Sequence, residues 1–187
     1  MFEKLLSRIG SYLTKHDLSY MIIGGQAVLL YGEPRMTRDI DITLGLGTDR
    51  LADLLGVIQD LALEPLPENL ESFVKETMVL PTLDKNTGIR VDFIFSFTPY
   101  EKEAIKRARK IAILGQEVNF ASPEDLIIHK IFAGRPRDLE DVKTILLKNS
   151  DLDSRYIRHW LEQFDESSEG KHFLITFEDL IKECAQT

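Results

Sequence analysis

Three aspartates lie inside short apolar segments of the sequence. Asp39 and Asp41 alternate with isoleucines, and Asp92 lies within the apolar run 91–95. On a strand this alternation turns Asp39 and Asp41 toward one face, with their α-carbons roughly 6.5–7 Å apart. Carboxylates among strand residues are costly to bury. Mg²⁺ or Mn²⁺, together with the phosphates of a nucleotide, would offset that cost, so the pattern predicts a metal site.

A glycine pair precedes these acids. Gly24 and Gly25 follow the apolar run 19–23 and come before a predicted helix over residues 26–31. Glycine lets the backbone turn sharply and lets a ligand approach closely, and the free amides at a helix start attract phosphate. The segment therefore predicts a phosphate site beside the acids. Thr37 and Arg38 directly precede Asp39 and are further candidates for phosphate contact.

Lys130 lies on a second apolar segment, which is predicted to be helical from Ser122 onward. A lysine on a mostly apolar helix is unusual unless its charge has a partner or a function. Contact with a nucleotide triphosphate is one interpretation, and extension of the side chain to solvent is the other. Asp138 and Asp141 follow at the start of the next helix, where acids also favour the helix dipole. Helix capping, a role in the site and a salt bridge that orients Lys130 all remain open for them.

The order and spacing of these motifs resemble the DNA polymerase β-like nucleotidyltransferase superfamily. The first motif combines the Gly24-Gly25 pair with the run Arg35 to Asp41 and the distant Asp92, and the second spans residues 122–141. The likeness covers roughly residues 20 to 145. It looks most similar to the small prokaryotic branch that includes nucleotidyltransferase toxins of the AbiEii/MenT type.

The resemblance implies an α+β fold, in which a mixed β-sheet flanked by helices forms a core over residues 1–121. A C-terminal helical lobe over residues 122–187 would contribute Lys130. The implied activity moves an NMP from an NTP such as ATP to an acceptor hydroxyl and releases pyrophosphate. The acceptor would be a tRNA 3′ end, a protein or a small molecule, and an antitoxin partner would accompany a toxin role. The implied catalytic and metal-binding residues are Asp39, Asp41 and Asp92, and the implied nucleotide-binding residues are Gly24, Gly25, Thr37, Arg38, Lys130 and Asp138.

A competing interpretation from another class is a catalytically silent module that binds nucleotide or protein on the same fold. The presence of all three acids in the expected order argues against it. Titration of the protein with Mg²⁺ and an NTP, followed by a turnover assay, separates the two interpretations.

Composition favours a cytoplasmic enzyme with one compact core or a core and a lobe. The 187 residues are 43% hydrophobic, which suffices for a core, and the one cysteine suits a reducing compartment. No segment approaches the length of a membrane helix. The net charge of −8 argues against nonspecific nucleic-acid binding. A basic cluster is either an RNA-binding face or, as we favour, a solvated helix face; it comprises Lys102, Lys106, Arg107, Arg109 and Lys110.

Periodicity and turn residues predict the remaining elements. The predicted strands cover 19–23, 39–44, 77–83, 89–95, 111–114 and 117–120. The predicted helices cover 2–15, 26–31, 49–62, 70–75, 100–110, 122 to about 134, 138–148, 151–165 and 176–185.

Overall fold

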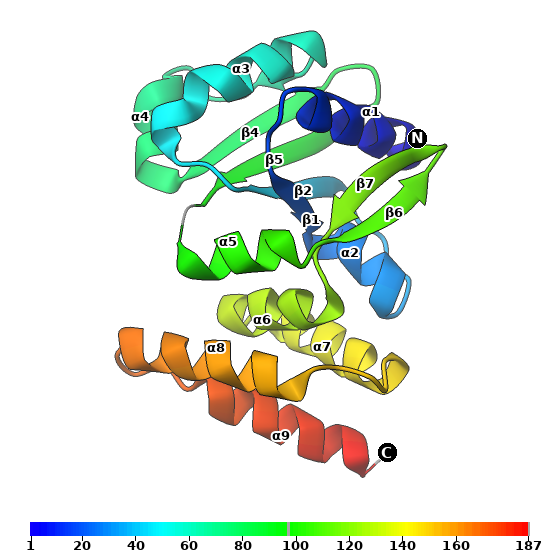
Figure 1. Ribbon diagram of the computed structural model, residues 1–187, viewed down its shortest axis with the longest axis vertical. Coiled ribbons are helices and arrows are strands. Elements are labelled where there is room, and N and C mark those ends of the chain that lie inside the picture. Colours follow the sequence, from blue (N-terminus) through cyan, green and yellow to red (C-terminus); the bar gives the residue numbers. More distant parts are fainter. Residues whose placement is uncertain (97, 187) are drawn as a thin grey trace. The chain divides into compact units, whose positions relative to one another are not determined.

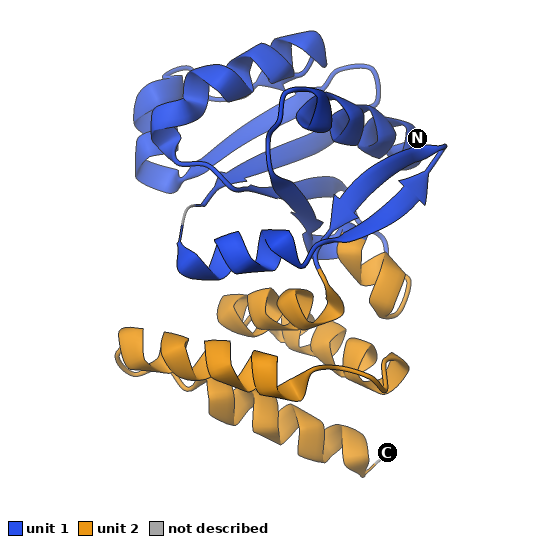
Figure 2. Ribbon diagram, viewed as in Figure 1, with its two compact units in different colours: residues 1–26, 36–121 blue, residues 27–35, 122–187 orange. Residues whose placement is uncertain are grey.

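The structure is a computed structural model that describes residues 1–96 and 98–186. The chain divides into two compact units (Figure 2). The first unit consists of residues 1–26 and 36–121, and the second consists of residues 27–35 together with the residues from 122 onward. The sequence did not indicate that residues 27–35 group with the C-terminal helices.

The first unit is built on a mixed sheet of seven strands within the described residues, in the order β3-β4-β5-β2-β1-β7-β6 (Figure 1). Strands β2 and β5 are parallel, as are β1 and β7, and the other neighbouring pairs are antiparallel. The strands are β1 (Tyr20–Ile23), β2 (Asp39–Leu44), β3 (Glu64–Pro65), β4 (Val79–Asp84), β5 (Ile89–Phe95), β6 (Arg109–Ile113) and β7 (Gln116–Phe120). The sheet and its flanking helices confirm the predicted α+β fold.

One face of this sheet is apolar and is covered by helices α1 (Phe2–Lys15) and α3 (Leu51–Asp60) (Figure 1). Neighbours in the strand register, such as Ile22 and Ile42, turn to the same face and are fully buried. The apolar stripe of α1 is buried too, because its residues recur at helical spacing and meet the sheet. The opposite face of β2 therefore carries its aspartates.

The predicted helix over 100–110 was wrong at its C-terminal end. Helix α5 (Pro99–Lys106) stops because Arg109 already pairs with Phe120 in the antiparallel β6–β7 ladder. The basic cluster is thus divided between a helix and a strand rather than forming one helix face. Lys110 Nζ lies 2.9 Å from Glu117 Oε2 across that ladder, which is an exposed structural pairing.

Two further helices of the first unit differ from the prediction in their bounds. The helix predicted over 49–62 starts with a 3₁₀ turn, η1 (Thr48–Arg50), and the Thr48 side chain makes no cap because Gly47 occupies the capping position. Helix α4 (Leu70–Thr77) is longer than predicted and ends where Met78 adopts a left-handed conformation with φ of 60°.

The second unit contains the helices α6 (Pro123–Ala133), α7 (Pro136–Lys148), α8 (Ser154–Ser167) and α9 (Phe173–Ala185). The later residues of α2 (Gly24–Tyr31) also belong to it. Ser122 caps α6 as predicted, because its hydroxyl accepts the backbone N–H of Asp125 at 3.1 Å. Apolar side chains from all four C-terminal helices are buried in this unit. No helix in the described part of the chain is long and apolar enough to cross a membrane.

Candidate active site

The parallel pairing of β2 with β5 brings the three aspartates onto one face of the sheet. Asp41 is the register partner of Asp92, and Asp39 is the partner of Arg90. Register partners on neighbouring strands turn to the same face, and so do residues two apart on one strand. Asp39 is exposed, whereas Asp41 and Asp92 are half-buried. The face that carries the acids is opposite the apolar face covered by α1 and α3.

Arg90 supplies a positive charge within this group of acids. Its Nε donates a hydrogen bond of 2.7 Å to Asp92 Oδ1. This hydrogen bond, with further attraction from Asp92, Asp39 and Asp41, raises the pKa of Arg90. The sequence reasoning did not single out Arg90. Its place two residues before Asp92 on the same strand was the signal that could have found it.

The acids fit a divalent cation by their chemistry, but one of them, Asp92, is bound to Arg90. Carboxylate oxygens are the donors that Mg²⁺ and Mn²⁺ prefer. In the arrangement with Arg90, no group of three or more His, Cys, Asp or Glu side chains among the described residues could hold a metal ion. A metal ion at Asp92 would compete with the Arg90 guanidinium for the carboxylate.

Gly24 lies directly beside Asp41. Strand β1 pairs with β2 so that Ile23 is opposite Asp41, and α2 begins at the next residue. Gly24 has a φ of +63°, and a Cβ added there would collide with the Asp41 carboxylate. Glycine is therefore required for two separate reasons, the left-handed backbone and the close approach of the acid. The glycine pair and the acids form one local group, as their spacing suggested.

We expect Gly24→Ala to destabilise the protein by about 2–3 kcal/mol, since it adds left-handed strain to a steric collision with Asp41. Chemical denaturation measures the loss. Gly56→Ala is the matched control, because Gly56 lies inside α3 with nothing near its missing Cβ. The control variant should be more stable than the wild type by about 0.5–1 kcal/mol. Equal stability of the two variants would contradict this account of Gly24.

The loop before Asp39 is tied to the start of α2. Gln26 Nε2 donates to Thr37 Oγ1 at 2.6 Å, and Gln26 is only 5% exposed. Thr37 thus lies next to the first turn of the helix, whereas Arg38 is exposed. Gln26 was not among the predicted site residues, although it directly follows the glycine pair. Its amide fixes the loop that leads to the acids.

Lys130 lies in a buried ionic network in the second unit. Its Nζ lies 2.6 Å from Asp138 Oδ1 and 2.8 Å from Asp141 Oδ2. Lys130 is 5% exposed, so the interpretation in which it extends to solvent is wrong. Of the alternatives left open for the two aspartates, the structure shows the salt bridge. Neither aspartate caps α7, whose capping position is Arg135.

Two arginines complete this network, and sequence reasoning missed both. Arg35 binds Asp141 through Nε and Nη2, each at 2.9 Å. Arg135 Nε donates to Asp138 Oδ2 at 2.6 Å. Burial raises the pKa of the Asp138 carboxyl, but the hydrogen bonds from Lys130 and Arg135 outweigh it and leave the pKa below its ordinary value. The hydrogen bonds from Lys130 and Arg135 thus favour the ionised form of Asp138.

His129, beside Lys130 on α6, makes stability depend on pH. Burial and, to a smaller extent, the charge of Lys130 lower its pKa to about 4. The unfolded chain, with an ordinary histidine pKa of about 6.5, therefore binds more protons between pH 6.5 and 4. The stabilisation is complete above pH 6.5 and is lost as the pH falls toward 4.

We expect this histidine to account for up to about 3 kcal/mol of stability lost between pH 6.5 and pH 4. Urea denaturation of the wild type and His129→Gln across this range measures it. The variant should show a shallower pH dependence. His172→Gln is the control, because His172 is exposed. Parallel curves for wild type and His129→Gln would contradict the assignment.

Solved structures of nucleotidyltransferases have the same fold as this chain. One is ANT(2″)-Ia in complex with adenylyl-2″-tobramycin, at 17% identity and a TM-score of 0.59, covering 88% of this chain and 97% of that one. Another is the lincomycin-bound lincosamide antibiotic adenylyltransferase LnuA, at 14% identity and a TM-score of 0.53, covering 76% of this chain and 94% of that one. A third is an antigenic nucleotidyltransferase-like protein from Paracoccidioides brasiliensis, at 17% identity and a TM-score of 0.55, covering 88% of each chain. At such identities the likeness shows the fold alone.

A sequence profile described as a nucleotidyltransferase of unknown function (DUF6036) matches residues 2–184 of the chain. A search of curated protein sequences gives no match.

Proposed function

The chain belongs to the nucleotidyltransferases of unknown function called DUF6036, and we propose that it transfers an NMP from an NTP to an acceptor hydroxyl. The observation that carries the proposal is the strand register. It sets Asp41 beside Asp92 and next to Gly24, with Asp39 on the same face. Carboxylates and a glycine turn at a helix start are the groups that a metal-bound triphosphate needs.

Asp39, Asp41 and Asp92 would hold Mg²⁺ or Mn²⁺. When bound, these cations would supply positive charge to the triphosphate and to the attacking oxygen. The free amides at the Gly24-Gly25 turn would bind phosphate oxygens, and Thr37 and Arg38 are placed by sequence to assist them. The motif shared with the superfamily also names Lys130 for the triphosphate and Asp138 as the residue that orients it, although the two are bound to each other in the structure.

The reaction proposed for this site is an in-line displacement. The acceptor oxygen forms a bond to the α-phosphorus, the bond from that phosphorus to the bridging oxygen breaks, and pyrophosphate leaves with it. The hydroxyl proton passes to the Asp92 carboxylate, the acid farthest from the glycine turn in the strand order. Asp39 and Asp41 would hold the divalent cations to which the phosphates bind.

ATP is the NTP that we propose, since two proteins with this fold are described as an adenylyltransferase and as bound to an adenylylated product. We place the reaction in the cytoplasm, with residues 1–121 as the catalytic part and residues 122–187 as a helical lobe. A tRNA or protein acceptor, and a toxin role with an antitoxin partner, rest on the motif resemblance to the AbiEii/MenT branch alone.

Incubating the protein with Mg²⁺, each α-labelled NTP in turn, and a cell lysate tests this proposal. Label should pass from one NTP to an acceptor with release of pyrophosphate. The ion pair between Arg90 and Asp92 is the observation that favours the alternative, a catalytically silent module. Calorimetric titration with Mg²⁺ and the same NTP separates the two, since binding without any turnover supports the silent module.

A further inference from the structure

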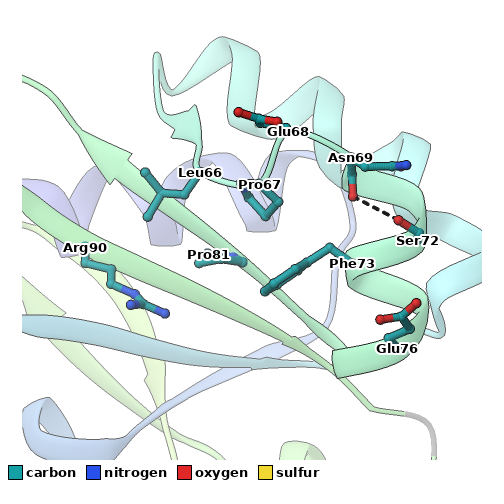
Figure 3. Close-up of a pocket in the computed structure, with 9 residues that line it drawn as sticks. All are labelled: Leu66, Pro67, Glu68, Asn69, Ser72, Phe73, Glu76, Pro81 and Arg90. Carbon is teal, nitrogen blue, oxygen red and sulfur yellow. Dashed lines mark hydrogen bonds between the residues drawn. The ribbon is translucent and has the colours of Figure 1, made fainter.

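A pocket of about 540 Å³ lies in the first unit, between α4 and strand β4 (Figure 3). Its apolar lining includes Leu66, Phe73 and Pro81, and Figure 3 shows Phe73 directed toward Pro81. Leu66 is 45% exposed and Phe73 is 37% exposed. Large apolar side chains left open around a concave surface are typical of a ligand site.

The strand register places this pocket next to the acids. Pro81 on β4 is the register partner of Asp92 on β5. Asp92 pairs in turn with Asp41 on β2, and Asp41 pairs with Ile23 on β1. These residues form one row across the sheet, at about 4.8 Å per strand. Arg90 belongs to both groups, since it lines the pocket and its Nε binds Asp92. The pocket thus begins about one strand spacing from Asp92.

The order of that row decides which substrate the pocket faces. Gly24, with its proposed phosphate role, lies at the β1 end, and the pocket lies at the β4 end. An in-line transfer requires the attacking and the leaving oxygens to be on opposite sides of the α-phosphorus. If pyrophosphate leaves toward Gly24, the acceptor hydroxyl must approach from the side of Asp92 and Pro81.

Charge indicates the chemical class of the acceptor. Two carboxylates, Glu68 and Glu76, line the pocket beside its apolar residues, and both are exposed, whereas the cation in the lining, Arg90, is bound to Asp92. Among the described residues, neither is held by a lysine or an arginine. They repel the phosphates of RNA and attract an amine. The apolar surface of Phe73 and Pro81 suits a ring or a short hydrocarbon.

We propose that this pocket is the acceptor subsite and that it takes a compact alcohol with an apolar face and an amino group. The inference rests on the proposed function, since it names the acceptor class for the same acids. The amine lies against Glu68 and Glu76, the apolar face lies on Phe73, and the hydroxyl points toward Asp92.

The first test is direct binding of a defined probe, trans-4-aminocyclohexanol, followed by the amide NMR shifts of the labelled protein in Mg²⁺ buffer. Shifts should concentrate at residues 66 and 68–76 and at the neighbours of Pro81, Leu80 and Thr82, with a dissociation constant in the millimolar range expected of so small a ligand. The uncharged trans-1,4-cyclohexanediol should bind about 2- to 5-fold more weakly, as expected for loss of one exposed ion pair.

Carboxylate variants give the matched control for this binding test. Replacing both Glu68→Gln and Glu76→Gln should remove the preference for the amine. Glu71→Gln should keep it, because Glu71 is exposed on α4, as Glu76 is, but does not line the pocket. Shifts located elsewhere, or equal binding of amine and diol to the wild type, overturn the inference.

The second test concerns the acceptor role. The wild type is incubated with α-labelled ATP and lysate, and the products are separated into RNA, protein and small cationic molecules. Label should enter the small cationic fraction. Phe73→Ala should raise the acceptor KM at least about 10-fold, as expected for loss of an apolar platform, and should leave the Kd for Mg²⁺-ATP within about 2-fold. Leu147→Ala, at an exposed leucine of α7, is the control.

The outcomes separate this inference from the proposed function. Label in RNA or protein, or a Phe73→Ala variant with unchanged acceptor kinetics, overturns the acceptor subsite and leaves nucleotidyl transfer standing. Failure of the wild type either to bind Mg²⁺-ATP or to label any fraction overturns both.

Discussion

Asp41→Asn is expected to reduce nucleotidyl transfer by about 10³-fold or more while the protein stays folded. Asp41 lies at the centre of the candidate site, between Asp92 on one side and the Gly24 turn on the other. Asparagine keeps the shape of the side chain against Gly24 but removes the charge that would hold a divalent cation. The rate of pyrophosphate release with the wild type and the variant measures the effect.

Thermal unfolding without metal shows whether Asp41 serves the site or the fold. Removing one of three like charges relieves repulsion, so the melting temperature of Asp41→Asn should hold or rise. Asp49→Asn, at an exposed acid of η1, should change neither activity nor stability. A large stability loss in Asp41→Asn would mean that the aspartate is structural.

Lys130→Met is expected to destabilise the protein by about 3–5 kcal/mol, because it leaves two buried carboxylates short of a cation. Asp138 and Asp141 are 3% and 5% exposed, and both contact the Lys130 amine. Arg35 and Arg135 remain in place, so we expect the lower part of that range. Urea denaturation at pH 7 measures the loss.

Further variants separate this structural role from a role in nucleotide binding. Adding Asp138→Asn alone to Lys130→Met should recover part of the lost stability, because Asp141 keeps both bonds from Arg35 and the arginine that loses its carboxylate, Arg135, is exposed. Lys143→Met, at a lysine with exposed glutamate partners, should cost far less stability than Lys130→Met. A Lys130→Met variant of normal stability that binds Mg²⁺-ATP about 10- to 150-fold more weakly would assign Lys130 to the triphosphate instead.

Local patterns were sufficient to predict most elements of the fold. The alternation in residues 39–42 and the apolar stripe of residues 2–15 correspond to β2 and α1 with the predicted bounds. The Ser-Pro pair at 122–123 marks the start of α6 for a local reason, a hydroxyl cap and a preset φ. Residues 100–110 were misread because helix propensity is local, whereas the pairing of Arg109 with Phe120 is a contact of the folded sheet.

The three aspartates and the glycine turn could be recognised by residue type and order. Spacing along the chain says which residues of one strand share a face, but it does not say which strands are neighbours. Only the folded sheet makes Asp41 and Asp92 register partners and sets Pro81 beside them. The same pairing explains the place of Arg90 among the acids, because the negative charges of aspartates on two neighbouring strands together attract its guanidinium.

The ionic network of Lys130 shows the same division. Its apolar helix and the nearby aspartates were visible in the sequence, but Arg35 is 106 residues away from its partner Asp141. Burial of a charge depends on every segment that packs around it, and none of those contacts is encoded in a local pattern. Residue types and their spacing thus identified the chemistry, whereas tertiary packing decided which charges meet and what partner each one has.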